Sequence, residues 1–262
     1  MSRSIPLALA AALFLPAVAC DDPPKATAPS ATAPAATPPP PSSPTPVASS
    51  APEAPRKRHE GPCSKDATVT FTDATLEGAV RVQLQKPTGP IPRADLGKVK
   101  TLNISTAPTD DELDPCLFPL FTGVKGLYLA PGKLDDITPL KGLTQLESVR
   151  ISITQVKDIS PLAGLIKLDR LDAGRTPVSD LTPLASCINL TELQIDDTEV
   201  GDLAPLAKLK KLEKLSIKRT KVSDVSPLRE LTKLKDLYIE GSLVKDLSAV
   251  RSIPGLKVHE GA

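Results

Sequence analysis

The sequence has very few aromatic residues and very few histidines. Only 2% of its 262 residues are aromatic, and none is Trp. A core with so few rings must be filled by Leu, Ile and Val, and a surface without Trp is poorly suited to stacking against sugars. The two histidines, His59 and His259, lie far apart in the chain. No group of Cys and His therefore has the spacing of a zinc site.

Catalytic signatures are also absent from the sequence. It has no G-x-S-x-G turn to present a nucleophilic serine and no Gly-rich loop to cradle phosphate. The formal net charge is only +1, which gives no overall attraction to nucleic acid or to an anionic membrane. The sequence predicts a protein that is not an enzyme, uses no cofactor and no metal ion, and does not bind nucleic acid.

The N-terminus has the pattern of an export signal. Arg3 precedes an apolar run over residues 5–15, which is too short to remain in a bilayer as a membrane span. The sequence AVAC follows and resembles the bacterial lipobox, although that motif prefers Leu where Ala17 stands. The resemblance implies lipidation of Cys20; the alternative is ordinary cleavage before it. We expect a signal peptide over residues 1–19 and an exported protein, lipid-anchored in the bacterial cell envelope and facing the periplasm or the cell surface.

A proline-rich segment follows the lipobox-like sequence. Twelve of the forty residues 21–60 are Pro, and most of the others are Ala, Ser and Thr. Such a composition has too little apolar surface to fold, and frequent Pro favours extended polyproline II with a reach of roughly 120 Å. We interpret residues 20–62 as the lipidation site and a disordered tether. The basic run at 56–59 is interpreted as a solvated boundary rather than a contact to lipid or cell-wall polymer.

From Asp136 onward, the sequence repeats with a period of 22 residues. Two copies read DISPLAGLIKLDRLDAGRTPVS and DLAPLAKLKKLEKLSIKRTKVS. Repeats of this length form solenoids, in which each unit buries its apolar face against its neighbours. The repeats begin at Asp136, Asp158, Asp180, Asp202, Asp224 and Asp246, the last being truncated, and a weaker copy begins at Asp114.

Each repeat encodes a short strand, a turn and a short helix. The alternation in LDRLDA (168–173) predicts a strand with one buried face. In TPL (182–184) and the equivalent Ser/Thr-Pro-Leu steps, we expect the hydroxyl residue to cap a short helix and Pro to take its first position. The Asp that begins each repeat supplies one carboxylate per turn, whereas Ca²⁺ needs six or more oxygens. We interpret these residues as acceptors for backbone N–H groups, not as a metal ladder.

The pattern L-x-x-L-x-I-x-x-T-x-V-x-D-L-S-P-L, matched over residues 114–262, resembles the internalin-type leucine-rich repeat of bacterial surface proteins. The resemblance implies an α/β solenoid with a parallel β-sheet on the concave face and short helices or 3₁₀ turns on the convex face. It also implies non-catalytic binding of a protein partner. The family usually has Asn where this chain has a column of hydroxyl residues, which can make only part of the Asn network. The column is Thr154, Thr176, Thr198, Thr220 and Ser242.

The segment before the repeats resembles the helical N-terminal cap of the same family. Leu76, Val80 and Leu84 lie on one face of a helix that would follow Asp73. We therefore expect the cap over residues 63–104 and the leucine-rich-repeat domain over residues 105–262. No comparable cap follows Leu256, so the sequence leaves open a frayed end or a docking surface there.

Three cysteines follow Cys20. Cys187 occupies a column of leucines and is expected to be a buried thiol. Cys63 is the first residue of the predicted cap, and Cys116 lies in the first repeat. An exported compartment favours a disulfide between these two residues, and the alternative is two free thiols.

The open face of the predicted sheet is the candidate partner site. Charges of opposite sign alternate along it, and we expect pairs between Arg170 and Glu192, between Lys214 and Asp236, and from Asp196 through Lys218 to Glu240. Tyr and Arg are residue types that anchor interfaces. The predicted partner contacts are the residues that this pairing leaves over, namely Tyr128, Arg150 and Tyr238.

The sequence thus predicts protein–protein recognition by a monomeric leucine-rich-repeat lipoprotein of the cell envelope, with a protein partner that it does not identify. Two alternatives remain open. The self-paired face fits a structural spacer with no specific ligand. The basic run favours a cell-wall polymer binder, which the missing aromatic residues disfavour. An acidic loop made of Asp110, Asp111, Glu112 and Asp114 is interpreted as a solvated insertion, and the alternative is a site for a cation or a basic partner.

Overall fold

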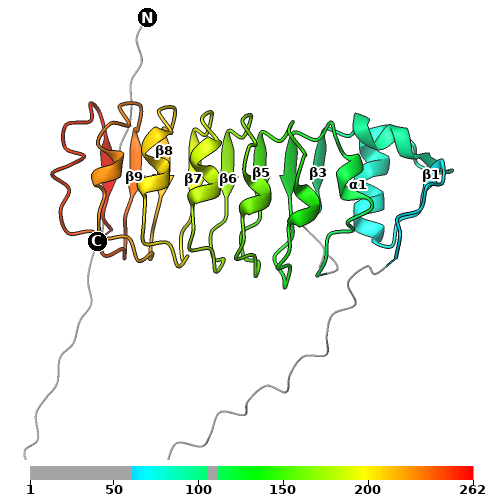
Figure 1. Ribbon diagram of the computed structural model, residues 1–262, viewed down its shortest axis with the longest axis horizontal. Helices are drawn as coiled ribbons and strands as arrows, with labels where there is room; N and C mark the ends of the chain where they lie inside the picture. The colour runs from blue at the N-terminus through cyan, green and yellow to red at the C-terminus, as the bar shows by residue number, and fades with distance from the viewer. Residues whose placement is uncertain (1–60, 106–110, 262) are drawn as a thin grey trace, which may run out of the picture. The chain divides into compact units, whose positions relative to one another are not determined.

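The computed structural model describes residues 61–105 and 111–261. The predicted signal peptide, Cys20 and the proline-rich segment lie outside these residues. Within the described residues, the chain forms a solenoid in which strands line one long face and 3₁₀ turns line the other (Figure 1). No helix in this part of the chain has the length and apolar character needed to cross a bilayer.

The N-terminal end of the solenoid is covered by helix α1 (Ala74–Leu84), which packs against the first strand of the large sheet. The carboxylate of Asp73 accepts hydrogen bonds from the backbone N–H groups of Thr75 at 2.7 Å and Leu76 at 3.2 Å. Leu76 and Val80 are buried in the core, as predicted from their spacing. Beside α1, strands β1 (Thr68–Val69) and β2 (Ile91–Pro92) pair antiparallel, and the 3₁₀ segment η1 (Arg93–Lys98) leads into the solenoid.

Eight parallel strands form the large sheet of the described residues, in the order β10 to β3. From β4 to β9, each residue pairs with the residue 22 positions later, as Arg170 pairs with Glu192. Lateral pairing therefore follows the sequence period directly. The strands are β3 (Thr101–Asn103), β4 (Gly126–Tyr128), β5 (Ser148–Arg150), β6 (Arg170–Asp172), β7 (Glu192–Gln194), β8 (Lys214–Ser216), β9 (Asp236–Tyr238) and β10 (Lys257–His259).

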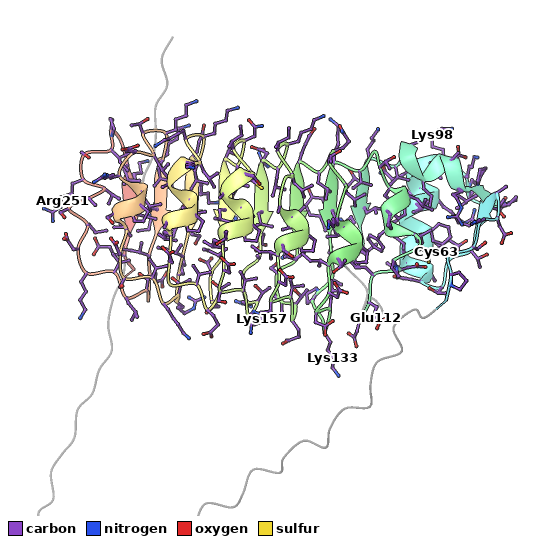
Figure 2. The ribbon with its side chains drawn as sticks, in the orientation of Figure 1. Cys63, Lys98, Glu112, Lys133, Lys157 and Arg251 are labelled. Atoms are coloured by element: carbon purple, nitrogen blue, oxygen red, sulfur yellow. A yellow bond between two sulfur atoms is a disulfide. The ribbon has the colours of Figure 1, made fainter. Side chains whose placement is uncertain are left out.

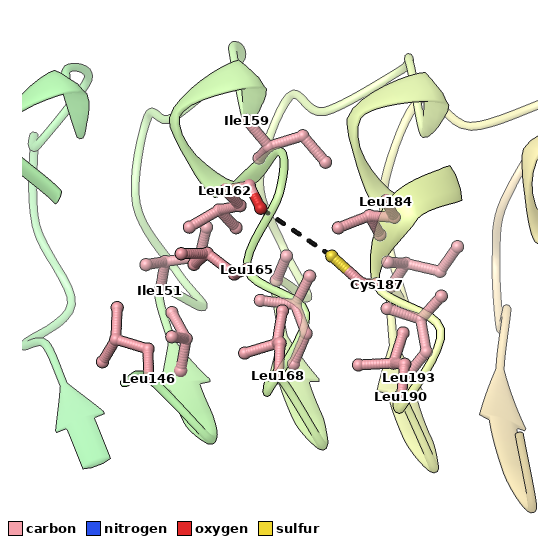
Figure 3. Close-up of a cluster of buried hydrophobic side chains, with 14 of the residues drawn as sticks. Leu146, Ile151, Ile159, Leu162, Leu165, Leu168, Leu184, Cys187, Leu190 and Leu193 are labelled. Carbon is pink, nitrogen blue, oxygen red and sulfur yellow. Dashed lines mark hydrogen bonds between the residues drawn. The ribbon is translucent and has the colours of Figure 1, made fainter. Parts of the chain in front are cut away.

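The core is a stack of leucine, isoleucine and valine columns that runs through the repeats (Figure 3). Cys187 replaces a leucine in one of these columns and is fully buried, which confirms the prediction from the sequence. Its thiol donates a 3.7 Å contact to the carbonyl oxygen of Leu162 in the preceding repeat (Figure 3). Burial raises the pKa of this thiol to about 11, so Cys187 is an unreactive core residue.

The convex face is made of short 3₁₀ turns, each preceded by an aspartate. The carboxylates of Asp180 and Asp224 accept hydrogen bonds from the backbone N–H groups of Thr182 at 2.8 Å and Ser226 at 2.7 Å. This confirms the interpretation of the Asp column as a structural feature of the turn. The 3₁₀ segments are η2 (Phe118–Leu120), η3 (Thr138–Leu140), η4 (Ser160–Leu162), η5 (Thr182–Ser186), η6 (Ala204–Lys208) and η7 (Ser226–Leu228).

The predicted capping role of the Ser/Thr hydroxyls is wrong. In η3, η4, η5 and η7 the hydroxyl residue is the first residue inside the turn, and the residue at the N-cap is Ile, Leu or Val, with no side-chain capping bond. The hydroxyl of Ser226 instead donates to Asp224 at 2.8 Å. The carboxylate of the aspartate two positions earlier accepts the backbone N–H of the hydroxyl residue. The aspartate therefore has the capping role that was predicted for the hydroxyl.

Four of the five residues of the hydroxyl column are buried just after the strand of their repeat, whereas Ser242 is partly exposed and its hydroxyl accepts the Val244 N–H at 3.5 Å. Thr154, Thr176, Thr198 and Thr220 are each at most 4% exposed. Each donates to the carbonyl three residues earlier in its own repeat, at 2.6–2.7 Å. The residue before each Thr has a left-handed backbone, with φ between 51° and 60°. The column therefore secures the bend within one repeat.

The C-terminal repeat still adds a strand, β10, to the sheet. This repeat is one residue shorter than the preceding ones, because His259 pairs with Tyr238 rather than with a residue 22 positions away. Leu243 is 57% exposed at this end, and Val258 and Leu256 are only partly buried. Within the described residues, no element covers the outer edge of β10.

A disulfide joins Cys63, which precedes β1, to Cys116, which precedes η2, with an S–S distance of 2.03 Å. The two residues are 53 positions apart in the sequence. The bond links the N-terminal cap to the first repeat.

Candidate binding surface on the strand face

The strand face presents columns of side chains that run across β3 to β10. In β5, β6, β7 and β9 the second residue is buried in the leucine core, and the first and third residues are partly or fully exposed on the strand face. The strand register places equivalent residues side by side, as the sequence repeats predicted. The column at the third position reads Asn103, Tyr128, Arg150, Asp172, Gln194, Ser216, Tyr238 and His259.

Ion pairs cross the middle of this face between repeats. The carboxylate of Glu192 lies 2.8 Å from the Lys214 ammonium and 3.9 Å from the Arg170 guanidinium. The hydrogen bond from Lys214 lowers the pKa of Glu192, and the same bond raises the pKa of Lys214. Glu192 is therefore shared between two cations, and the expected pairing of Arg170 with Glu192 is present.

The expected pairing of Lys214 with Asp236 is wrong. Lys214 reaches back to Glu192, and Asp236 instead lies 3.0 Å from Nε2 of His259 on the following strand. In the next column, Lys218 pairs with Glu240 at 3.0 Å, as expected. The expected pairing of Asp196 with the Lys218 ammonium is wrong, because the Asp196 carboxylate instead accepts the backbone N–H of Lys218 at 2.8 Å.

Tyr128 and Arg150 are neighbours on β4 and β5. The expectation that Arg150 is unpaired is wrong, because its Nε lies 3.3 Å from Oδ2 of Asp172 and donates to the hydroxyl of Ser152 at 3.1 Å. The hydroxyl of Tyr128 donates to Ser148 at 3.3 Å. These contacts hold both side chains in fixed positions while leaving half of the Arg150 side chain exposed.

Tyr238 lies at the other end of the face, with β6, β7 and β8 between it and Arg150. Its ring is stacked on the His259 imidazole, with centroids 4.2 Å apart and planes 9° from parallel. The ammonium groups of Lys218 and Lys214 lie 5.2 Å and 5.9 Å from the ring centroid. The structure therefore brings Tyr128 and Arg150 together but separates both from Tyr238.

A shallow depression adjoins Tyr238 on the strand face. Side chains that can donate and accept hydrogen bonds surround it, which suits a polar group from a partner rather than an apolar one. The residues that line it are Gln194, Asp196, Lys214, Ser216, Lys218 and Tyr238.

The other candidate sites of the sequence carry no comparable arrangement. No group of three or more His, Cys, Asp or Glu side chains in the described residues has the geometry of a metal site. In the acidic loop, the carboxylate of Asp111 accepts the Lys133 N–H at 3.2 Å, and Asp114 accepts the Cys116 N–H at 2.7 Å. The basic run at 56–59 lies outside the described residues.

No protein-family model matches the chain, and no curated protein matches it by sequence. Two solved structures from Listeria monocytogenes are similar to it. An internalin (inlF) is 27% identical over 72% of this chain, with a TM-score of 0.66. Internalin C2 (inlC2) is 28% identical over 73% of this chain, with a TM-score of 0.61. The match covers 56% of the first protein and 94% of the second.

The similar structures and the parallel sheet with 3₁₀ turns agree on the architecture. Both the fold and the repeat type predicted from the sequence are confirmed.

Proposed function

We propose that this internalin-type leucine-rich-repeat protein is a non-catalytic binding protein that recognises another protein through its strand face. The observation that carries the proposal is the strand face itself. Eight parallel strands hold its side chains in register, and no element of the described residues covers it. A rigid array of exposed side chains is a surface on which a partner can bind with little loss of side-chain entropy.

The two ends of the face offer different contacts. At one end, Tyr128 and Arg150 lie side by side and are each held by a hydrogen bond. At the other end, Tyr238 and His259 form a stacked pair beside the polar depression. Tyr and Arg side chains supply much of the binding energy at protein interfaces when they are fixed in advance. We therefore assign partner contacts to Tyr128, Arg150 and Tyr238, and add His259 to them.

The same proposal places the protein in the bacterial cell envelope, with Cys20 lipidated and residues 21–60 as the tether. The apolar run and the lipobox-like AVAC sequence support export. The disulfide between Cys63 and Cys116 fits an oxidising compartment. Incorporation of a labelled fatty acid into the wild-type chain, and its loss in Cys20→Ser, is the expected result. Equal labelling of both proteins contradicts the anchor.

A structural spacer is the second candidate, and the ion pairs favour it. Arg150 with Asp172, Lys214 with Glu192, and Lys218 with Glu240 each link adjacent repeats. Exposed pairs of this kind contribute about 0–1 kcal/mol each, but they occupy charges that a ligand would otherwise use. A spacer would therefore show no specific retention of any protein.

The test uses the folded part of the chain, residues 61–262, as bait for an envelope extract of the source bacterium. Three baits are compared: the wild type, Tyr128→Ala/Arg150→Ala/Tyr238→Ala, and a control variant in the segments that lead from a 3₁₀ turn to the next strand. The control is Ile166→Ala/Ile188→Ala, since both isoleucines are 54% exposed outside the strand face. Any retained protein is then purified and its affinity for each bait is measured.

A protein retained by the wild type and the control, but at least about tenfold weaker on the strand-face variant, supports the proposal. Equal retention by all three folded baits moves the site away from the strand face. A longer bait that includes the basic run at 56–59 tests the polymer binder, which is favoured if this bait retains purified cell-wall polymer and loses it at high salt. No retention by any bait favours the spacer.

A further inference from the structure

Positive charge is concentrated on one long edge of the last three repeats. We use the name basic rim for residues 207–213, 229–235 and 251–257, which lead from each convex turn to the next strand. Only Glu213 and Glu230 are acidic in these segments, against eight cationic residues. The eight are Lys208, Lys210, Lys211, Arg229, Lys233, Lys235, Arg251 and Lys257. The equivalent segments of the three preceding repeats, 141–147, 163–169 and 185–191, hold two cationic and two acidic residues.

The opposite edge of the same three repeats has the other sign. Segments 197–202, 219–224 and 241–246 lead from each strand to the next turn, and they hold five acidic and three cationic residues. The turns explain part of this excess, because Asp202, Asp224 and Asp246 accept backbone hydrogen bonds there. Lys157 marks this edge in an earlier repeat (Figure 2). The formal net charge of +1 therefore hides an uneven distribution, with positive charge on one edge of these repeats and negative charge on the other.

The cations of the basic rim, unlike these aspartates, do not form hydrogen bonds with the backbone of the described 3₁₀ turns. Three of them have partners: Lys210 pairs with Glu230, Lys235 pairs with Glu213, and Lys211 donates to an Asn side chain. The other five are exposed, and their side chains make no ion pair or hydrogen bond with the described residues. The five are Lys208, Arg229, Lys233, Arg251 and Lys257. Eight cations against two carboxylates leave an excess of positive charge along this edge, and like charges so close together repel one another.

The rim also lacks apolar anchors. Leu209, Leu212, Leu231 and Leu234 are buried in the core, and Leu256 is only partly buried. Apart from Pro254, the other residues at the surface of the rim are charged, small or polar. Protein interfaces depend on buried aromatic or aliphatic anchors. A surface with positive charge but no apolar anchors is suited to binding another surface that carries fixed anionic groups. Each Lys or Arg close to anionic lipid strengthens attachment about fivefold.

We propose that the basic rim docks on the anionic phosphate headgroups of a phospholipid membrane. The rim lies along the edge of the strand face, so docking leaves that face open to a partner and directs it along the membrane plane. The proposed anchor at Cys20 would hold the domain close to such a surface and raise its effective concentration there. The inference does not depend on a protein partner.

The experiment measures sedimentation of residues 61–262 with vesicles at low ionic strength. Vesicles of mixed phosphatidylcholine and phosphatidylglycerol are compared with vesicles of phosphatidylcholine alone. The rim variant is Lys208→Glu/Lys233→Glu/Arg251→Glu. The matched control, Lys157→Glu/Lys221→Glu/Lys245→Glu, makes the same change in net charge on the opposite edge. Unchanged thermal unfolding shows that each variant is folded.

We expect the wild type to bind the anionic vesicles only, and to bind less as salt is added. The rim variant should lose on the order of 100-fold in partitioning, and the control should lose no more than about tenfold. Equal losses in both variants would overturn the rim as the docking site. Absence of binding to anionic vesicles, or binding to inorganic polyphosphate alone, would overturn the membrane as the ligand.

Discussion

The hydroxyl of Thr198 donates a 2.7 Å hydrogen bond to the carbonyl of Ile195, at the point where β7 ends. Thr198 is 4% exposed, so water cannot easily replace the bond. Replacing Thr198 by Val keeps the shape of the side chain but leaves the carbonyl without this donor. We expect the free energy of unfolding to fall by about 1–2 kcal/mol in Thr198→Val, measured by urea denaturation.

Thr198→Ser is the control for this prediction, because it keeps the hydroxyl and removes only a methyl group. It should cost less than Thr198→Val. Equal losses in the two variants would mean that packing of the methyl group, rather than the hydrogen bond, is the contribution of the hydroxyl column.

A second prediction concerns the left-handed residue that precedes the hydroxyl position in each repeat. Ile153 has φ 60° at this position, and Gly241 has φ 69° at the equivalent position. A β-branched residue is strained there, whereas Asn tolerates the conformation. Ile153→Asn should raise the free energy of unfolding by about 0.5–1 kcal/mol.

The reverse change at Gly241 should destabilise the protein. Gly241→Ala adds a Cβ in a left-handed conformation, which costs about 1–2 kcal/mol. The new Cβ would also lie 2.8 Å from Cγ of Arg219, which must then move. Thermal unfolding of both variants tests the pair, and a gain in Gly241→Ala would contradict the account of strain.

The sequence predicted the repeats and their strand register because both follow from chain periodicity. A 22-residue period places Arg170 beside Glu192 whatever the details of the turns. It likewise places Cys187 in the leucine core. Within the turn, both the aspartate and the hydroxyl residue two positions later recur with the same period, so periodicity alone did not show which of them caps the turn. Which of these caps the turn depends on side-chain reach, and the carboxylate of Asp180 reaches the N–H of Thr182.

The ion pairs of the strand face were predicted less well, because a charged side chain on one strand can pair with a residue on either adjacent strand. Lys214 has acidic residues on both adjacent strands and pairs with Glu192 rather than with Asp236. His259 was missed for a different reason. A strict period of 22 from Tyr238 leads to Glu260, but the shorter last repeat places His259 beside Tyr238. The signal that could have found it is Val258, which aligns with the buried Leu237 only at a spacing of 21 residues.

A third prediction concerns the disulfide between Cys63 and Cys116. The bond closes a segment of 53 residues that contains the whole N-terminal cap. Removing it by Cys63→Ser/Cys116→Ser should lower the free energy of unfolding by about 2–4 kcal/mol, because the unfolded chain gains freedom. Denaturant unfolding measures the loss.

Intact mass under denaturing conditions is the independent check on the bond itself. Reduction of the wild-type chain should add about two daltons, for two hydrogens. Cys187→Ala, which keeps both bridged cysteines, should give the same increase. Labelling of Cys63 or Cys116 by an alkylating reagent without prior reduction would contradict the bond.

The last prediction concerns acid. The pKa of Asp180 lies below its ordinary value of 3.8, chiefly because the side chain of Thr182 donates to it. The pKa of Asp224 is lowered chiefly by the backbone N–H of Ser226. A carboxylate whose pKa is lower in the folded state stabilises the fold above its unfolded pKa, and this contribution is lost as the pH falls through the folded pKa. We therefore expect the urea midpoint to be level above about pH 5 and to decrease below about pH 4.

Asp180→Asn/Asp224→Asn separates the charge from the hydrogen bond. Asn still accepts the backbone N–H but does not titrate, so the variant should be less stable than the wild type at neutral pH and its midpoint should change less with acid. Glu112→Gln/Glu260→Gln is the control, because neither carboxylate accepts a hydrogen bond in the described residues. Its acid profile should parallel that of the wild type. If the Asn variant also parallels the wild type, the Asp column stabilises the turns through hydrogen bonds that do not depend on its charge, and the acid sensitivity comes from the ion pairs of Glu192 and its neighbours.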